Sequence, residues 1–108
     1  MLNSTGSSTD KVLNLLGLAY RAHKTVLGEQ VLKRIREVRL LILAIDISEK
    51  SRERYLKKCH YYHIDSMADF SSVELSQALG KENVKVVGII DEGFKRTILK
   101  KYKEGHYG

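Results

Sequence analysis

The sequence predicts an α/β fold, a three-layer α/β/α sandwich around a small, four-stranded, mostly buried mixed sheet. Two observations lead to this prediction. Segments with the apolar spacing of helices alternate with short β-rich segments. Two of the latter, 40–45 and 85–90, are apolar without alternation, apart from Lys85 at the start of the second. A strand that is apolar on both faces is expected to be covered on both faces, so helices should lie on either side of the sheet.

The chain is predicted to form one domain, residues 10–103, between two short tails. Its 108 residues are enough for a single domain with a hydrophobic core. Residues 1–9 are small and polar and are expected to be disordered, and residues 104–108 are expected to fray.

The first half of the domain should alternate helix, strand and helix. The first helix should begin at a Thr9 or Asp10 cap and end near His23. The β-branched segment 25–27 predicts a short strand, after which Gly28 precedes a second helix. The apolar positions expected to face the core are Val12, Leu15, Leu16, Ala19 and Ala22 in the first helix and Val31, Leu32 and Ile35 in the second.

The second half should continue this alternation. The buried strand at 40–45 leads into a third helix at 48–61 and then into a strand at 63–67. A capping-box pattern at 71–74 predicts a short fourth helix, which Gly80 should end. The last helix, which follows the second buried strand, should face the core with Phe94, Ile98, Leu99 and Tyr102.

The charge balance favours a nucleic-acid partner. The chain has 19 Lys and Arg against 13 Asp and Glu, which gives a formal charge of +6 and a pI near 9.5. No apolar run approaches the roughly 20 residues of a membrane span, and no signal-peptide pattern opens the sequence. The one cysteine, Cys59, excludes an intramolecular disulfide and suits a reducing compartment. We therefore expect a cytoplasmic protein that binds nucleic acid rather than a membrane.

The segment 21–36 is where we expect such a partner to bind. It passes from the end of one helix through a short extended piece into the next helix, with Gly28 just before that helix. A helix start offers unpaired backbone N–H groups and the positive end of the helix dipole. Both favour an anionic partner such as RNA.

The order and spacing of several motifs resemble a known family. Leu-Gly-Leu-Ala-Tyr-Arg-Ala at 16–22, followed by Lys-Thr-Val-Leu-Gly-Glu at 24–29, resembles the start of the bacterial YlxQ-type proteins. These belong to the L-seven-Ae / L-thirty-e superfamily of ribosomal and kink-turn RNA-binding proteins. The similarity covers about residues 10–100. Its further segments are 40–48, 57–59, 74–81 and 86–95.

This resemblance implies an L-thirty-e-like sandwich whose second helix reads a kink-turn, an RNA helix bent sharply beside tandem G·A pairs. The family pattern Asn-Glu-x-x-Lys falls here on Glu29, Gln30 and Lys33. Together with the N–H groups after Gly28, these residues would read bases, and Lys33 can bond a guanine O6 or N7. The residues expected to hold phosphates are Lys24 and Arg34.

The position of Glu29 departs from the family pattern. A glutamate there lacks the amide donor of asparagine and brings a negative charge near the RNA phosphates, although it can accept from guanine N1 and N2. Gln30 is the milder change, because its amide keeps one acceptor oxygen.

The resemblance implies a second RNA contact in the loop before the fourth helix, residues 67–71. Phe70 would stack on an extruded base there, next to Ser71, whereas Asp69 would oppose phosphate.

Two other clusters suggest metal or catalytic chemistry but have simpler explanations. Cys59, His60 and His63 are only three candidate ligands, and Cys59 lies on the apolar stripe of its helix, so we predict a buried thiol and no metal. Asp46 and Asp91 each follow a buried strand, yet no activated nucleophile or glycine-rich phosphate loop accompanies them. Turn and cap roles explain both, so we predict no enzyme activity and no cofactor.

The function expected from the sequence is that of a non-catalytic RNA-binding protein of the ribosomal L-seven-Ae type. Its partner would be structured RNA, a kink-turn or ribosomal RNA, with the ribosome as a further candidate and the protein itself a monomer. The alternative is a protein-interaction module of the ribosome or translation machinery that keeps the fold but binds kink-turns weakly.

Overall fold

The computed structural model describes the backbone of residues 8–107 and the side chains of residues 9–104. The predicted disorder of residues 1–9 therefore falls mostly outside the described residues. The helices are α1 (Ser8–Arg21), α2 (Glu29–Lys33), the 3-10 helix η1 (Ile35–Glu37), α3 (Glu49–Tyr62), α4 (Ser72–Leu79) and α5 (Glu92–Tyr107). The strands are β1 (Thr25–Leu27), β2 (Leu40–Ala44), β3 (Asp65–Phe70) and β4 (Val86–Ile89).

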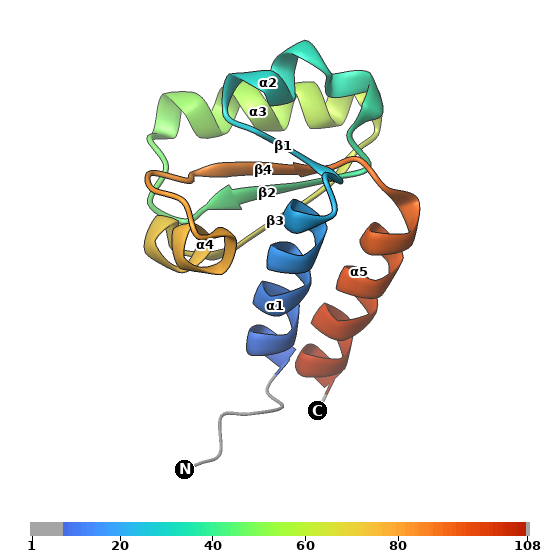
Figure 1. Ribbon diagram of the computed structural model, residues 1–108. Coiled ribbons are helices and arrows are strands. Elements are labelled where there is room, and N and C mark those ends of the chain that lie inside the picture. Colours follow the sequence, from blue (N-terminus) through green and yellow to red (C-terminus); the bar gives the residue numbers. More distant parts are fainter. Residues whose placement is uncertain (1–7, 108) are drawn as a thin grey trace.

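The four strands form one mixed sheet in the order β1-β4-β2-β3. β4 runs antiparallel to both of its neighbours, and β2 runs parallel to the edge strand β3. Figure 1 shows α2 and α3 on one face of this sheet and α1, α4 and α5 on the other. The predicted three-layer α/β/α sandwich is thereby confirmed.

The alternating direction of the side chains along β2 explains why the core has two layers. Successive side chains of a strand point to opposite faces. Leu40 and Ile42 accordingly join the apolar cluster under α1, α4 and α5, whereas Leu41 and Leu43 join the cluster under α2 and α3. All four are at most 1% exposed, so β2 is covered on both faces as predicted.

The strands place the loops at two ends of the sheet. Leu27 pairs with Val87 at one end, where the chain continues into α2, and we call this the α2 end. Leu40 pairs with Ile89 at the other, where the chain continues into α5, and we call this the α5 end.

Several local predictions are confirmed. Ser71 is the N-cap of α4 and shares a capping box with Glu74, and Gly80 ends that helix in the left-handed conformation. Asp91 accepts a hydrogen bond from the Phe94 N–H at the start of α5, which is the cap role predicted for it.

The second helix is shorter than predicted. α2 ends at Lys33, Arg34 leaves the helical conformation (φ −116°), and a 3-10 turn carries the chain on to Glu37. Such tight turns are common where a helix ends. Here the turn keeps both Val31 and Ile35 buried while the chain returns to the sheet.

The third strand begins later than predicted, at Asp65 rather than at His63. α3 continues to Tyr62, and His63 takes the left-handed conformation with a φ of 58°. The Ile64 N–H then bonds the Cys59 carbonyl at 2.8 Å, which closes the helix end and delays the strand.

The first helix is shifted and the last is longer than predicted. α1 begins at Ser8, ahead of the predicted cap at Thr9 or Asp10, and ends at Arg21 rather than near His23. The backbone of α5 is helical to Tyr107. Within the described part of the chain, no helix has both the length and the hydropathy needed to cross a membrane.

Candidate nucleic-acid interface

Gly28 forms the turn that starts α2, and only its backbone conformation requires glycine. Its φ of 54° and ψ of −131° are unfavourable for a side chain, although a Cβ would meet nothing within 4 Å. Its N–H donates to the Val86 carbonyl at 3.4 Å, and its own carbonyl accepts from the Tyr55 hydroxyl at 3.3 Å. The turn is therefore attached both to β4 and to α3.

The three residues of the family pattern lie exposed on α2. Gln30 and Lys33 are three positions apart, so they share one side of the helix. Glu29 precedes Lys33 by four positions, yet no ion pair joins them or ties either to another described side chain. Their polar groups are therefore available to a ligand.

The backbone at the start of α2 should attract an anionic ligand less strongly than the sequence suggests. Gly28 provides no side-chain cap, so the first N–H groups of α2 remain open. With five residues, however, α2 aligns few peptide dipoles, and its side chains must supply most of the attraction.

Arg34, predicted to hold phosphate, is occupied by Glu37. Its Nε and Nη2 donate to the two carboxylate oxygens at 2.9 and 2.7 Å. The same hydrogen bonds hold the pKa of Glu37 below its usual value. Arg34 joins α2 to η1 rather than presenting a free guanidinium.

Lys24 and Gly28 lie at opposite ends of β1, Lys24 at the α5 end and Gly28 at the α2 end. The Lys24 carbonyl accepts from the Ile90 N–H at the α5 end, on the far side of β1 from Gly28. Four residues of extended chain span about 13 Å. Proximity to Gly28 in the sequence therefore does not give a shared surface.

Phe70 does not stack on a base, and that prediction is wrong. Its side chain is only 2% exposed and belongs to the core under α1, α4 and α5. The cause is a bulge between β2 and β3: Ile42 pairs with Met67, but Ala44 pairs with Phe70. The extra residue in β3 turns Phe70 inward and leaves Asp69 exposed.

Ser71 is likewise structural, because its hydroxyl caps α4. Its Oγ accepts from the Glu74 N–H at 3.1 Å, and its own N–H donates to the Glu74 carboxylate at 2.9 Å. Of the predicted second contact, residues 67–71, neither Phe70 nor Ser71 has a side chain free to bind RNA.

Two exposed apolar residues near α4 are not expected from the sequence. Ile45, predicted as buried strand, is 50% exposed just after β2, and Val73 in the first turn of α4 is 61% exposed. Asp46 accepts from the Ser72 N–H at 2.7 Å and from its hydroxyl at 2.6 Å, so the two segments lie together at the α2 end. Helical spacing could have placed Val73 outside, whereas nothing in the apolar run 40–45 separates Ile45 from its buried neighbours.

A cavity of about 340 Å³ adjoins the turn at Gly28. It lies between the start of α2, α3 and the loop from α4 to β4. Its charged lining residues are Glu29, Lys81, Glu82 and Lys85. Lys81 and Lys85 add positive charge at this end of the sheet that no sequence motif indicates.

The alternative metal and catalytic sites are not supported. Cys59 is buried, as predicted, and burial raises the pKa of its thiol to about 11. No group of three or more potential metal ligands occurs among the described residues. Asp46 and Asp91 each accept hydrogen bonds at a helix start, and those from Ser72 lower the pKa of Asp46.

Comparison with known proteins places the chain in a family. No protein-family model matches it. The RNA-binding protein YlxQ of Enterococcus faecium is 37% identical over 89 residues, 80% of this chain and 85% of that protein. YlxQ of Bacillus subtilis (strain 168) is 39% identical over 88 residues, 79% of this chain and 88% of that protein.

Two solved structures share the fold. A Bacillus halodurans protein of unknown function has a TM-score of 0.82 at 35% identity, over 86% of this chain and 97% of that one. The Giardia lamblia 15.5kD RNA binding protein has a TM-score of 0.72 at 16% identity, over 99% of this chain and 92% of that one, a likeness of fold alone. From the two YlxQ relatives, this chain belongs to the YlxQ family.

Proposed function

We propose that this chain is a non-catalytic RNA-binding protein that recognises a kink-turn, or a related bent RNA of the ribosome, with its α2 end. Two YlxQ relatives at 37% and 39% identity are named as RNA-binding proteins. The observation that carries the proposal is the pair Gln30 and Lys33, both exposed on one side of α2, where Lys33 forms no ion pair with a described side chain.

Each group at the α2 end has a role in this proposal. Lys33 bonds a guanine edge or a phosphate, and Gln30 offers both a donor and an acceptor to a base edge. Ile45 and Val73, rather than Phe70, provide the apolar contact for an extruded nucleotide. Phosphate contacts dominate the affinity, which falls steeply with salt.

Glu29 determines how tightly this surface binds. Its carboxylate lies one helical turn from Lys33 and adds negative charge where the RNA backbone approaches. Replacing it by the amide of the family pattern removes that repulsion and restores a donor. We expect Glu29→Asn to bind a kink-turn more tightly than the natural chain does.

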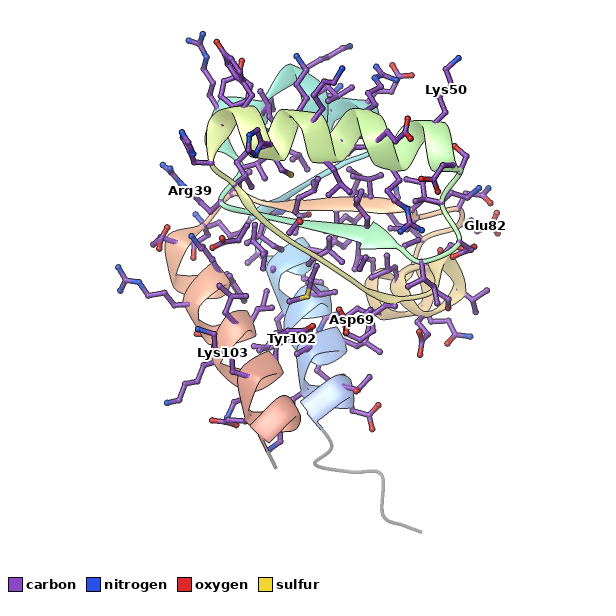
Figure 2. All side chains as sticks on the ribbon, turned by 180° about the vertical axis from the view of Figure 1, so that it is seen from behind. Arg39, Lys50, Asp69, Glu82, Tyr102 and Lys103 are labelled. Carbon is purple, nitrogen blue, oxygen red and sulfur yellow. The ribbon has the colours of Figure 1, made fainter. Side chains whose placement is uncertain are left out.

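The test compares a kink-turn RNA with the same duplex carrying Watson–Crick pairs in place of the G·A pairs. The natural chain should bind the kink-turn more tightly in a gel-shift titration. Lys33→Gln should weaken that binding about fivefold or more, since a base contact of this kind contributes about 1–3 kcal/mol. Lys103→Gln, an equal charge change far along α5 (Figure 2), is the matched control. Equal affinity for the two RNAs would refute specific recognition.

The alternative, a protein-interaction module of the translation machinery, depends partly on Asp69. The carboxylate of Asp69 accepts from the Tyr102 hydroxyl at 3.1 and 3.2 Å, so it already has a structural partner on α5. We therefore favour RNA, bound by a cytoplasmic monomer. A partner protein recovered equally well from nuclease-treated and untreated lysate would reverse this preference.

A further inference from the structure

A second cleft, of about 420 Å³, lies at the α5 end of the sheet. It is bounded by the end of α3, by η1 and the residues after it, and by the first turn of α5. In Figure 2, Arg39 marks this end of the sheet, whereas Lys50 and Glu82 lie at the opposite end. The polar and aromatic residues that line the cleft include Arg36, Arg39, Tyr61, His63, Glu92 and Lys95.

The cleft has an excess of positive charge. The carboxylate that lines the cleft, Glu92, pairs with Arg96 Nε at 3.6 Å, and the lining Lys95 pairs through its Nζ with Asp65 at 3.4 Å. Arg36 and Arg39 are exposed, and neither pairs with a carboxylate among the described side chains. Four cations against two carboxylates leave two guanidinium groups for an anion. Their planar donor pattern matches phosphate oxygens.

The exposed aromatic ring of Tyr61 lines the same cleft as these two arginines. Tyr61 is 73% exposed, the highest fraction among the large apolar side chains that remain exposed in the described structure. Its ring meets that of Tyr62 edge to face, with 4.8 Å between centroids. Tyr62 is half-buried and packs on the core under α2 and α3, so it gives the Tyr61 ring a contact with a side chain held by the core. An exposed tyrosine ring is a suitable platform for a nucleobase.

We propose that this cleft is a second nucleic-acid contact, which takes one or two nucleotides of single-stranded RNA. The base stacks on Tyr61, and the phosphates bind Arg36 and Arg39. Stacking on an aromatic side chain combined with a basic path for the backbone is how proteins hold unpaired nucleotides. β4 separates this cleft from the α2 end by about 13 Å, so the two surfaces bind different parts of an RNA. The proposed binding of single-stranded RNA in this cleft does not depend on recognition of a kink-turn at the α2 end.

The test is a titration of the isotope-labelled full-length chain with a single-stranded uridine tetranucleotide, followed by amide chemical shifts. Shifts should cluster at residues 36–39 and 61–64 and around the start of α5. Tyr61→Ala should weaken binding about fivefold or more. Arg36→Gln with Arg39→Gln should weaken it similarly and reduce the slope of log affinity against log salt by about 0.7 for each phosphate that the variant no longer neutralises.

The matched control removes two other exposed positive charges. Lys50→Gln with Lys103→Gln changes the net charge equally at positions outside the cleft (Figure 2), so it should affect tetranucleotide binding far less than the arginine pair does. Lys33→Gln should weaken kink-turn binding without affecting the tetranucleotide, so the two proposals can fail separately. The cleft proposal is overturned if the tyrosine and arginine variants bind the tetranucleotide like the natural chain, or if the shifts appear only at the α2 end.

Discussion

Replacing Gly17 by alanine should destabilise the protein, although alanine is the better helix former. In a helix interior this exchange normally gains about 1 kcal/mol. Gly17 lies where α1 meets α4, and a Cβ there would stand 2.6 Å from the backbone oxygen of Ala78. Ordinary contact begins at 3.4 Å, so the helices would have to separate by about 0.8 Å. A backbone oxygen cannot rotate away as a side chain can.

Overpacking of this kind costs about 1–3 kcal/mol, which outweighs the gain in propensity. The mid-range of that cost leaves a net loss of about 1 kcal/mol, and its upper end about 2 kcal/mol, in the free energy of unfolding measured in urea. The thermal midpoint should fall by about 5 °C. Asn14→Ala, at an exposed position of the same helix, is the control and should be neutral or slightly stabilising. A Gly17→Ala variant as stable as this control would show that α1 and α4 separate freely.

Three further predictions concern single sites. His23 has a φ of 61°, so His23→Gly should raise the thermal midpoint by relieving about 1 kcal/mol of backbone strain, and an unchanged midpoint would contradict this. The lowered pKa of Asp46 implies stabilisation that is present at neutral pH and lost as pH falls through the folded pKa. The Asp46→Asn variant should therefore have a lower free energy of unfolding than the natural chain at pH 7. In urea titrations this difference in free energy should shrink below about pH 4, and a difference that stayed constant in acid would contradict the prediction. With a thiol pKa of about 11, Cys59 should react with iodoacetamide at pH 8 at least about a hundredfold more slowly in the folded than in the unfolded chain, and comparable rates would indicate frequent opening of α3.

Local signals predict the elements well because they depend on neighbouring residues. The capping box at 71–74 and the glycine at 80 predict both ends of α4 correctly. The uninterrupted apolar run at 40–45 predicts the central strand, which ends one residue earlier, at Ala44. These patterns reflect hydrogen bonds and burial within a few residues of chain.

The site is harder to predict because it depends on contacts between distant segments. β3 buries only Met67 and Phe70, three positions apart, so the period of two that identifies a strand is absent. The bulge that turns Phe70 inward is visible only when β2 lies beside β3. The Asp46–Ser72 hydrogen bonds join segments 26 residues apart, and no local pattern indicates them.

Both proposed RNA contacts depend on one continuous segment, residues 29–39. Lys33 belongs to the proposed contact at the α2 end, and Arg36 lines the cleft. Between them, the ion pair of Arg34 with Glu37 links α2 to η1. The apolar side chains that hold the segment in the core are Val31, Ile35 and Val38. Because three buried anchors and an ion pair fix the segment, the spacing between the two surfaces is a property of the core rather than of a flexible linker. An RNA that contacts both must present its bend and its unpaired nucleotides at that spacing, and selectivity then arises from geometry as well as from the individual contacts.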